Sequence, residues 1–372
     1  MRVVVRGVGT SRFAKQPEAP ATELAASAVL EAFEDAEVEH VDAVYVGTVF
    51  GAPGVAQRVL HGLGVTDVPI LTLENACASG TSAFVEAHAA VESGRYRRVL
   101  ALGVEQMTAA FDGAIHPEPT DAEGRSGMAL PSLYAMAAHR YLHEGLATEE
   151  QLAAVSVKNH AHAVHNDRAQ YGGRHTVEEV LASPMIADPL TLLQCCPISD
   201  GAAAAVLAPA ERSEDVAVLS AQLASGGLWD HRSPHVWGFD LVRSTAERAL
   251  ADAGTGVDEI DLAEVHDAFT IGEITTVEAL GLVEVGRAGR AAADGETALG
   301  GRVVVNPSGG LLSRGHPLGA TGLAQIAEAT WQLRGVAGAR QVHGAQRALV
   351  ETMGGGVSGI DGNACVVTVL GG

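Results

Sequence analysis

An internal duplication constrains the fold of this chain more than any other feature. At a constant offset, Gly80 matches Gly319 and Ala83 matches Gly322 within two apolar, glycine-marked segments. Two further pairs of segments flank this one in the same order along the chain: 41–47 with 260–266, and 97–105 with 346–354. Each matched block combines a helix-like and a strand-like run, so the chain is predicted to fold as two related halves of helix, strand, loop, helix and strand.

Short apolar runs between turn residues predict the strands, and alanine-rich helical stretches lie between them. The expected strands are 2–7, 43–47, 99–104, 202–207, 216–224, 262–265, 303–306, 348–352 and 364–370. Strands that alternate with helices indicate α/β layers. We expect an N-terminal half over 1–210 and a C-terminal half over 211–372. The first half includes an inserted region at about 108–188, which lacks the repeat pattern and is suited to a substrate lid or binding loop.

Composition and charge exclude several classes of protein. The 372 residues suffice for two domain-sized cores or one large double core. A net charge of -21, with lysine only at positions 15 and 158, argues against nucleic-acid binding. No apolar run reaches the length of a membrane span, and the N-terminal strand pattern does not resemble a signal peptide, so we expect a cytoplasmic protein. The four cysteines suggest neither a disulfide framework nor a zinc site.

One cysteine and one histidine each precede an apolar helix that is marked by glycines. Cys77 lies in the run ENACASG, and His316 lies in the run NPSGGLLSRGHPLGATG. A thiol is a strong nucleophile only as the thiolate, and both a helix N-terminus and a nearby imidazole lower its pKa. The pair therefore predicts covalent catalysis in which a thiolate attacks an acyl group.

The chain resembles the thiolase superfamily over nearly its whole length. Besides the two runs above, the matching segments are GVEQMT (103–108), PISDGAAA (197–204), VHDAFT (265–270) and MGGG (353–356). The HDAF version resembles the branch of sterol-carrier-type and archaeal acetoacetyl-CoA thiolases. The resemblance implies a five-layer αβαβα fold made of two similar halves, and a homodimer or homotetramer.

The resemblance also implies a catalytic role for each of four residues. Cys77 would carry the acyl group, and His316 would accept its proton and later polarise a thioester oxygen. His266 would hold an oxyanion directly or through a water, and the backbone N–H groups of Cys77 and Gly354 would form a second oxyanion hole. Preorganised donors of this kind contribute about 3–4 kcal/mol each to transition-state stabilisation. Coenzyme A thioesters would be the substrates, with no bound cofactor and no metal.

One departure from the family pattern concerns the second half-reaction. Many thiolases carry a second cysteine as acid and base, and here Thr352 occupies that position. The sterol-carrier-type branch can place a cysteine inside the histidine motif instead, where this chain has Ala268. A threonine hydroxyl is far too weak an acid to replace a thiol at neutral pH. Cys365 is expected to be buried in the last strand, so His266 or His316 remains to deprotonate the second substrate.

Several functions are compatible with these motifs. The first is an acetyl-CoA acetyltransferase or 3-ketoacyl-CoA thiolase. The alternative is a thiolase-like acyltransferase or retro-aldolase on acyl-CoA side chains, possibly as a subunit of a complex with a small zinc-ribbon and oligonucleotide-fold-like protein. Thiolase-like aldolases rely on tyrosines, and all five tyrosines lie in the first half, far along the chain from His266 and Met353, which argues against the aldolase. No motif identifies the coenzyme A phosphate site, for which Arg168 and Arg174 are candidates.

Overall fold

A ten-stranded mixed sheet organises the computed structural model, which describes residues 2–116, 118–230, 232–355 and 357–372. The strands of the first half are β1 (Val3–Thr10), β2 (Ala43–Gly47), β3 (Ile70–Leu73), β4 (Val99–Gln106) and β7 (Asp200–Pro209). Those of the second half are β8 (Val216–Ala224), β9 (Leu262–Glu264), β10 (Val304–Val305), β11 (Arg347–Gly354) and β12 (Ala364–Gly371). Gly356 of the MGGG run lies outside the described residues.

The strand order reproduces the internal duplication. The sheet runs β10-β9-β11-β12-β8-β1-β7-β4-β2-β3. Outward from the β1–β8 seam, the first half follows the order β1, β7, β4, β2, β3, and the second half follows β8, β12, β11, β9, β10. Each strand therefore has a counterpart at the same position, which confirms the prediction of two similar halves. The predicted strands recur within a few residues, whereas β3, a four-residue edge strand, was not predicted.

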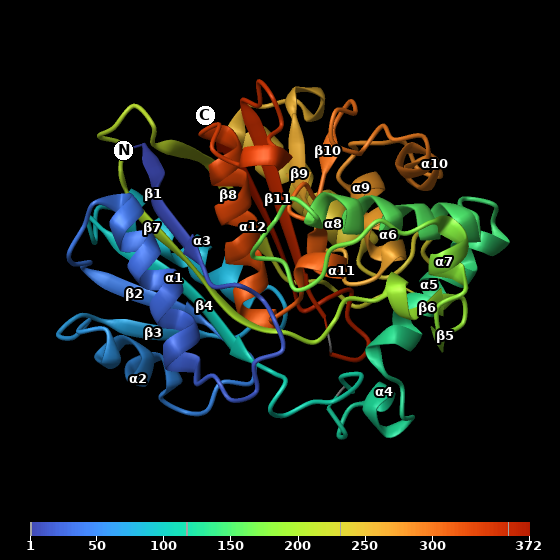
Figure 1. The fold of residues 1–372 in the computed structure, drawn as a ribbon, viewed down its shortest axis with the longest axis horizontal. Helices are drawn as coiled ribbons and strands as arrows, with labels where there is room; N and C mark the ends of the chain where they lie inside the picture. Colours follow the sequence, from blue (N-terminus) through green and yellow to red (C-terminus); the bar gives the residue numbers. More distant parts are fainter. Residues whose placement is uncertain (1, 117, 231, 356) are drawn as a thin grey trace.

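Helices complete five layers around the two half-sheets (Figure 1). On one outer face, α1 (Ala21–Ala36) packs against β1 and β7, and on the other α8 (Phe239–Ala253) packs against β8 and β12. Between the half-sheets lie α3 (Ser79–Glu92) and α12 (Leu318–Leu333). Almost every residue of α12 is buried, as expected for a helix that is apolar on all sides. The predicted αβαβα order is therefore confirmed.

Two glycines that the duplication aligns are in direct contact where α3 and α12 meet. A Cβ added at Gly80 would lie 2.3 Å from the carbonyl oxygen of Gly319, and one added at Gly103 of β4 would lie 2.2 Å from the same oxygen. Only residues without a side chain permit this approach. It brings the N-terminal ends of both helices together, and the residues just before them, Cys77 and His316, become neighbours.

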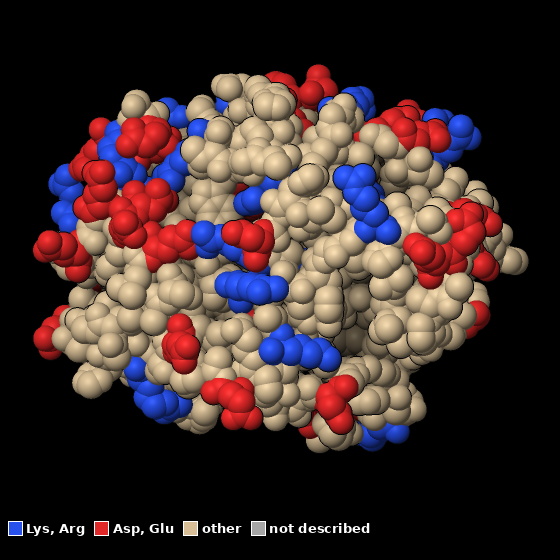
Figure 2. Space-filling view, viewed as in Figure 1, with Lys and Arg blue, Asp and Glu red and all other residues tan. Residues whose placement is uncertain are grey.

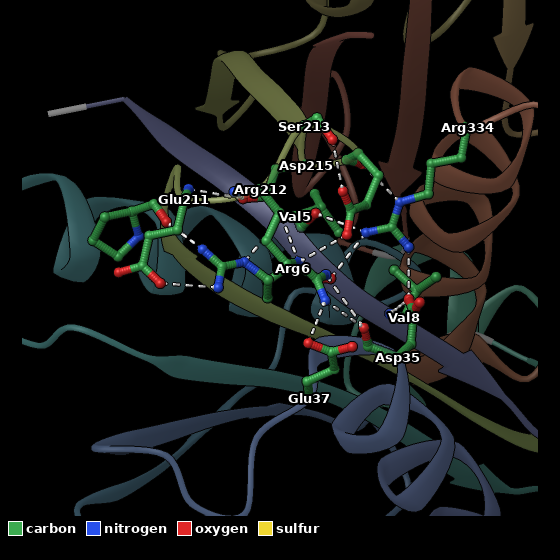
Figure 3. A network of polar contacts seen from close by, with 12 residues as sticks. Val5, Arg6, Val8, Asp35, Glu37, Glu211, Arg212, Ser213, Asp215 and Arg334 are labelled. Atoms are coloured by element: carbon green, nitrogen blue, oxygen red, sulfur yellow. Dashed lines mark hydrogen bonds and ion pairs between the residues drawn. The ribbon is translucent and has the colours of Figure 1, made fainter.

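A network of arginines joins the two halves at the seam (Figure 3). The β1–β8 ladder has only two residue pairs, and the β1–β7 ladder is irregular beside Arg6. Arg212 and Arg334 donate to the carbonyl oxygen of Arg6 over 2.5 Å and 2.9 Å. Arg334, which follows α12, also pairs with Asp35 of α1 at 2.7 Å. These contacts connect the end of α12 in the middle layer to α1 in an outer layer and to β1 at the seam.

The remaining elements surround this core. They are α2 (Val55–Gly62), α4 (Ala122–Arg125), α5 (Leu130–His143), α6 (Glu149–Ala163), α7 (Val177–Leu181), β5 (Met185–Ala187), β6 (Leu190–Thr191), α9 (Thr270–Ala279), α10 (Ala288–Ala293) and α11 (Gly310–Arg314). Helices α5 and α6 of the inserted region pack against the C-terminal half, on α9, α10 and α11 (Figure 1). Figure 2 shows a hollow on the face of the molecule that is turned toward the viewer. Among the described residues, no helix has the length and apolar character needed to cross a membrane.

Candidate active site

Cys77 lies in a tight loop between β3 and the start of α3. Ala76, directly before it, has a φ of 48°, a conformation that non-glycine residues rarely adopt. Hydrogen bonds hold the loop: the Asn75 N–H donates to Ser79 Oγ over 2.9 Å, and Ser79 Oγ donates to the Ala76 carbonyl over 2.6 Å. Strain of this kind persists where the surroundings enforce it, as they do at many catalytic positions. The loop leaves the half-buried Cys77 side chain facing the second half of the molecule.

His316 faces the thiol with its free nitrogen. Its Nε2 lies 3.3 Å from Cys77 Sγ, and its Nδ1 lies 2.8 Å from Thr321 Oγ1. Thr321 Oγ1 donates its single hydrogen to the Pro317 carbonyl over 2.9 Å, so it accepts a hydrogen bond from Nδ1–H. The remaining lone pair, on Nε2, therefore faces the thiol and can take its proton.

Burial makes the resting pair neutral. It raises the pKa of the Cys77 thiol to about 12, although the backbone N–H groups of Cys77 and Gly355 act in the opposite direction. Burial also holds the pKa of His316 well below its ordinary value. The direction of this shift is opposite to the one expected from a helix N-terminus and an imidazole, because desolvation is the largest contribution.

His266 completes a cluster of three side chains. Its ring centroid lies 5.0 Å from that of His316, and ligand-type atoms of Cys77, His266 and His316 lie within 4.8 Å of one another. Burial lowers the pKa of His266 to about 3, so the ring is neutral. Its Nδ1 is buried without a hydrogen-bond partner in the described part of the chain. The sequence motifs thus brought together a thiol and two neutral imidazoles, a set that suits acyl transfer and could also bind a soft metal ion.

Asp267 positions backbone rather than substrate. Its carboxylate accepts hydrogen bonds from the Leu311 N–H and from Asn159 Nδ2, each over 2.7 Å. Asn159 also donates to Glu273, which forms a buried ion pair with Lys158 at 3.0 Å. This network fixes the loop after β9 against the turn before α11, and so fixes His266 relative to His316.

The end of β11 approaches the cysteine loop through glycines. A Cβ at Gly354 would lie 2.1 Å from the Asn75 carbonyl oxygen, so no other residue fits there. The next amide, that of Gly355, interacts with the Cys77 thiol. The sequence analysis proposed the N–H of Gly354 for the oxyanion hole and did not propose that of Gly355. The MGGG run, which includes both glycines, could have indicated it.

The position of the usual second cysteine offers no acid or base. Thr352 is fully buried, and its hydroxyl donates to Gln325 Oε1 over 3.1 Å. Gln325 in turn donates to the Val265 carbonyl over 3.0 Å. Thr352 therefore supports the strand end that carries His266. Cys365 is buried in β12, as expected.

One tyrosine reaches the site, contrary to the sequence-based argument. The Tyr134 ring of α5 lies 4.5 Å from the Phe269 ring and 6.2 Å from the Trp237 ring, measured between centroids. Burial raises the pKa of Tyr134, and the nearby Cys77 and Glu351 raise it further. The argument from sequence separation was wrong for Tyr134, because the inserted region that carries this residue packs on the second half of the molecule. The absence of a nearby tyrosine no longer argues against an aldolase.

The two candidate phosphate-binding arginines differ in their surroundings. Arg168 forms an ion pair with both carboxylate oxygens of Glu31 at 2.6 Å and lies over the Trp331 ring. Its guanidinium is thus already engaged. Arg174 is exposed, so it remains the better candidate of the two.

Comparison with known proteins identifies the family. Residues 3–211 match the family model "Thiolase, N-terminal domain", and residues 229–366 match "Thiolase C-terminal domain-like". The chain belongs to the thiolase family. Acetyl-CoA acetyltransferase of Methanothermobacter thermautotrophicus is 44% identical, over 95% of this chain and 96% of that protein. Sterol carrier protein 2 of Gallus gallus is 38% identical, over 99% of this chain and 71% of that protein.

A solved structure extends the comparison to three dimensions. The structure of an "Ltp2-ChsH2(DUF35) aldolase" superposes with a TM-score of 0.84 at 25% sequence identity, covering 100% of this chain and 97% of that one. The expected resemblance to archaeal and sterol-carrier-type members is confirmed by the two sequence relatives. The thiolase is therefore an acyltransferase of the type that uses acyl-CoA thioesters.

Proposed function

We propose that this thiolase exchanges acyl groups between coenzyme A thioesters through a thioester on Cys77. The observation that carries the proposal is the 3.3 Å approach of His316 Nε2 to Cys77 Sγ, with the opposite ring nitrogen bonded to Thr321. A nucleophile, its base and an orienting group are the three parts that covalent acyl transfer requires.

In the first half-reaction, Cys77 Sγ attacks the thioester carbonyl while its proton moves to His316 Nε2. The carbonyl oxygen becomes an oxyanion, and the backbone N–H groups of Cys77 and Gly355, which interact with the thiol, would stabilise it together with that of Gly354, which the family resemblance implies. The intermediate collapses by breaking the bond to the coenzyme A sulfur. That sulfur takes the proton from His316 and leaves as the free thiol, so His316 returns to its neutral form.

In the second half-reaction, a base removes a proton from the α-carbon of a second acyl-CoA. The Thr352 hydroxyl is engaged in a hydrogen bond to Gln325, and Ala268 has no polar group. His316 and His266, each with a free ring nitrogen, are therefore the candidates for this base. The resulting carbanion attacks the acyl carbon on Cys77, and the sulfur leaves as a thiolate. The thiolate then takes up the removed proton, which restores the resting neutral pair.

Intact-protein mass spectrometry after mixing with acetyl-CoA or acetoacetyl-CoA tests the first half-reaction. We expect a mass increase of one acetyl group, mapped by peptide analysis to Cys77, and no adduct on Cys77→Ser. An adduct elsewhere, or wild-type turnover by Cys77→Ser, would reject the proposal.

Aldol cleavage is the second candidate function, and two observations favour it. The aldolase named above shares the fold at a TM-score of 0.84, and Tyr134 lies beside Phe269 at the site. We expect a β-hydroxyacyl-CoA to remain uncleaved by the thiolase. Release of a ketone or aldehyde that stops in Tyr134→Phe would instead assign the aldolase activity.

The assembly and location of the protein belong to the same proposal. We infer a homodimer or homotetramer, with the β3 edge of the sheet as the candidate interface, because of the two edge strands β10 is buried whereas Leu71 of β3 is 46% exposed. A small zinc-ribbon and oligonucleotide-fold-like partner is a further expectation, supported by the two-component name of the related aldolase. A cytoplasmic location stays a prediction.

A further inference from the structure

A buried carboxylate lies close to the catalytic pair and takes no part in the chemistry described so far. It belongs to Glu105, near the end of β4, whose side chain is only 1% exposed. A carboxylate is tolerated inside a protein only where hydrogen-bond donors or cations replace the water that it has lost. The groups around Glu105 therefore indicate what the residue does.

Four donors from two separate segments meet at this carboxylate. In the loop after β2, the N–H groups of Val49 and Phe50 donate to it over 2.9 Å each, and Thr48 Oγ1 lies within 3.2 Å. From the first turn of α12, the Gly319 N–H donates to it over 3.0 Å. Burial raises the pKa of Glu105, and these four groups act in the opposite direction by stabilising the charge. Glu105 thus joins a loop of the first half to the helix that carries the second half of the site.

This junction lies between the first turns of α3 and α12. A Cβ added at Gly47, the last residue of β2, would lie 2.4 Å from the first carbonyl group of α3. One added at Gly319 would lie 2.7 Å from the Gly47 carbonyl oxygen and 3.0 Å from Glu105 Oε2. The end of β2 is therefore packed against both helices. Cys77 lies just before one of these turns and His316 just before the other, so their 3.3 Å approach depends on this junction.

We propose that Glu105 is a positioning residue for acyl transfer: its carboxylate holds the first turn of α12, and with it His316, at the distance from Cys77 that proton transfer requires. The inference rests on the proposed acyl transfer. Glu105 does not act as the base, because both of its oxygens already accept backbone N–H groups. Precise placement matters, since a displacement of about 1 Å in a reacting group can cost about a hundredfold in rate.

The charge of Glu105 acts on the nucleophile in the opposite sense. Burial is the largest cause of the raised pKa of the Cys77 thiol, and the nearby Glu105 carboxylate raises this pKa further. A neutral side chain at this position would make the thiolate easier to form while holding His316 less well. A reaction that needs only the thiolate should then become faster, whereas acyl transfer, which needs the thiol and its base in line, should become slower. A purely structural role would not separate the two reactions.

The test compares these two reactions in Glu105→Gln. This variant removes the charge and turns an NH₂ group toward backbone N–H groups that the carboxylate accepts. We expect single-turnover acylation of Cys77 by acetyl-CoA to become at least tenfold slower. Alkylation of the same thiol by iodoacetamide at fixed pH should become faster, by about twofold or more. Peptide mapping by mass spectrometry confirms that both reagents react at Cys77.

Glu278→Gln is the matched control. Glu278 is also 1% exposed, and it accepts hydrogen bonds from the Gly286 N–H over 2.9 Å, the Ala288 N–H over 3.1 Å and the Tyr141 hydroxyl over 2.9 Å. None of these donors belongs to α12 or to the cysteine loop. The control should lose a similar free energy of unfolding in urea and keep both rates within about twofold of the wild type.

Each outcome separates the inference from the proposed function. If the wild-type protein forms no acyl-enzyme, acyl transfer fails and the inference with it. If Glu105→Gln acylates within about twofold of the wild type, acyl transfer stands and the inference is overturned. Equal slowing in Glu278→Gln, or a fall of alkylation together with acylation, would show that Glu105 acts through stability alone, which also overturns it.

Glu105→Asp decides the question where Glu105→Gln does not fold. It keeps the charge but shortens the side chain by one methylene group, so the carboxylate cannot reach both segments as before. We expect slower acylation with alkylation close to the wild-type rate and an unchanged circular dichroism spectrum. Wild-type acylation in this variant would overturn the inference.

Discussion

At the scale of single residues, the hydroxyl of Thr321 determines which nitrogen of His316 faces the nucleophile. Thr321→Val removes the acceptor of Nδ1–H and lets the ring adopt the tautomer that presents N–H to the thiol. We expect acylation of Cys77 to slow by about tenfold or more, the equivalent of ~1.4 kcal/mol in the barrier. Single-turnover acylation followed by mass spectrometry measures this.

Thr330→Val provides the control for that substitution. Thr330 lies on the same helix, is fully buried and donates to the Ile326 carbonyl over 2.8 Å, the same i−4 bond that Thr321 makes to Pro317. Both variants lose that bond, but only Thr321 contacts His316. Equal losses of rate in the two variants would show that Thr321 acts through helix stability alone.

The neutral resting pair has a distinct dependence on pH. A thiol with its pKa raised to about 12 stays protonated at neutral pH, and its thiolate fraction still rises tenfold per pH unit well above pH 9. We therefore expect the rate of Cys77 alkylation by iodoacetamide to keep rising between pH 7 and 10. A plateau at neutral pH would reveal a thiolate–imidazolium pair instead.

At the scale of helices and strands, the contact between α3 and α12 holds the catalytic pair together. Gly80→Ala places a methyl group 2.3 Å from the Gly319 carbonyl oxygen, and α12 must move away. We expect a loss of about 1–3 kcal/mol in the free energy of unfolding, despite the gain in helix propensity, together with slower acylation. Urea unfolding and the acylation rate measure the two effects.

Gly62→Ala is the matched control, because Gly62 ends helix α2 with no atom within 4 Å of an added Cβ. It should be neutral or stabilising. An equally neutral Gly80→Ala would show that the helices can separate without consequence for Cys77 and His316.

The same helices show how far the sequence could predict the molecule. The repeat and the short apolar runs of the strands determine the layers, so the core and the meeting of Cys77 with His316 were predictable. The sequence did not indicate that burial would outweigh the helix N-terminus in the pKa of Cys77. It also could not place Tyr134, because the inserted region has no counterpart in the repeat and its docking depends on tertiary contacts.

At the scale of the whole molecule, the two halves share their middle layer. Helices α3 and α12 each contact strands of both halves, so neither half encloses a complete core alone. Although the chain is matched by two family models, over 3–211 and 229–366, we expect it to unfold as one cooperative unit. A single urea transition, seen equally by circular dichroism and tryptophan fluorescence, would support this.

A substitution of Arg334 measures how much the seam network contributes to the cooperative stability of the two halves. Its guanidinium is mostly buried, pairs with Asp35 and donates to the carbonyls of Val5 and Arg6. Arg334→Met removes the cation that pairs with Asp35 and the donor to the Val5 carbonyl, while Arg212 still donates to the Arg6 carbonyl. We expect a cost of about 2 kcal/mol, since Asp35 itself is partly exposed. The matched control is Arg290→Met, which breaks an exposed pair with Asp294 and should cost at most about 0.5 kcal/mol. If urea unfolding gives equal losses for both variants, the seam network adds nothing beyond a surface ion pair. A larger loss in Arg334→Met, with the transition still single, would show that the network stabilises both halves together.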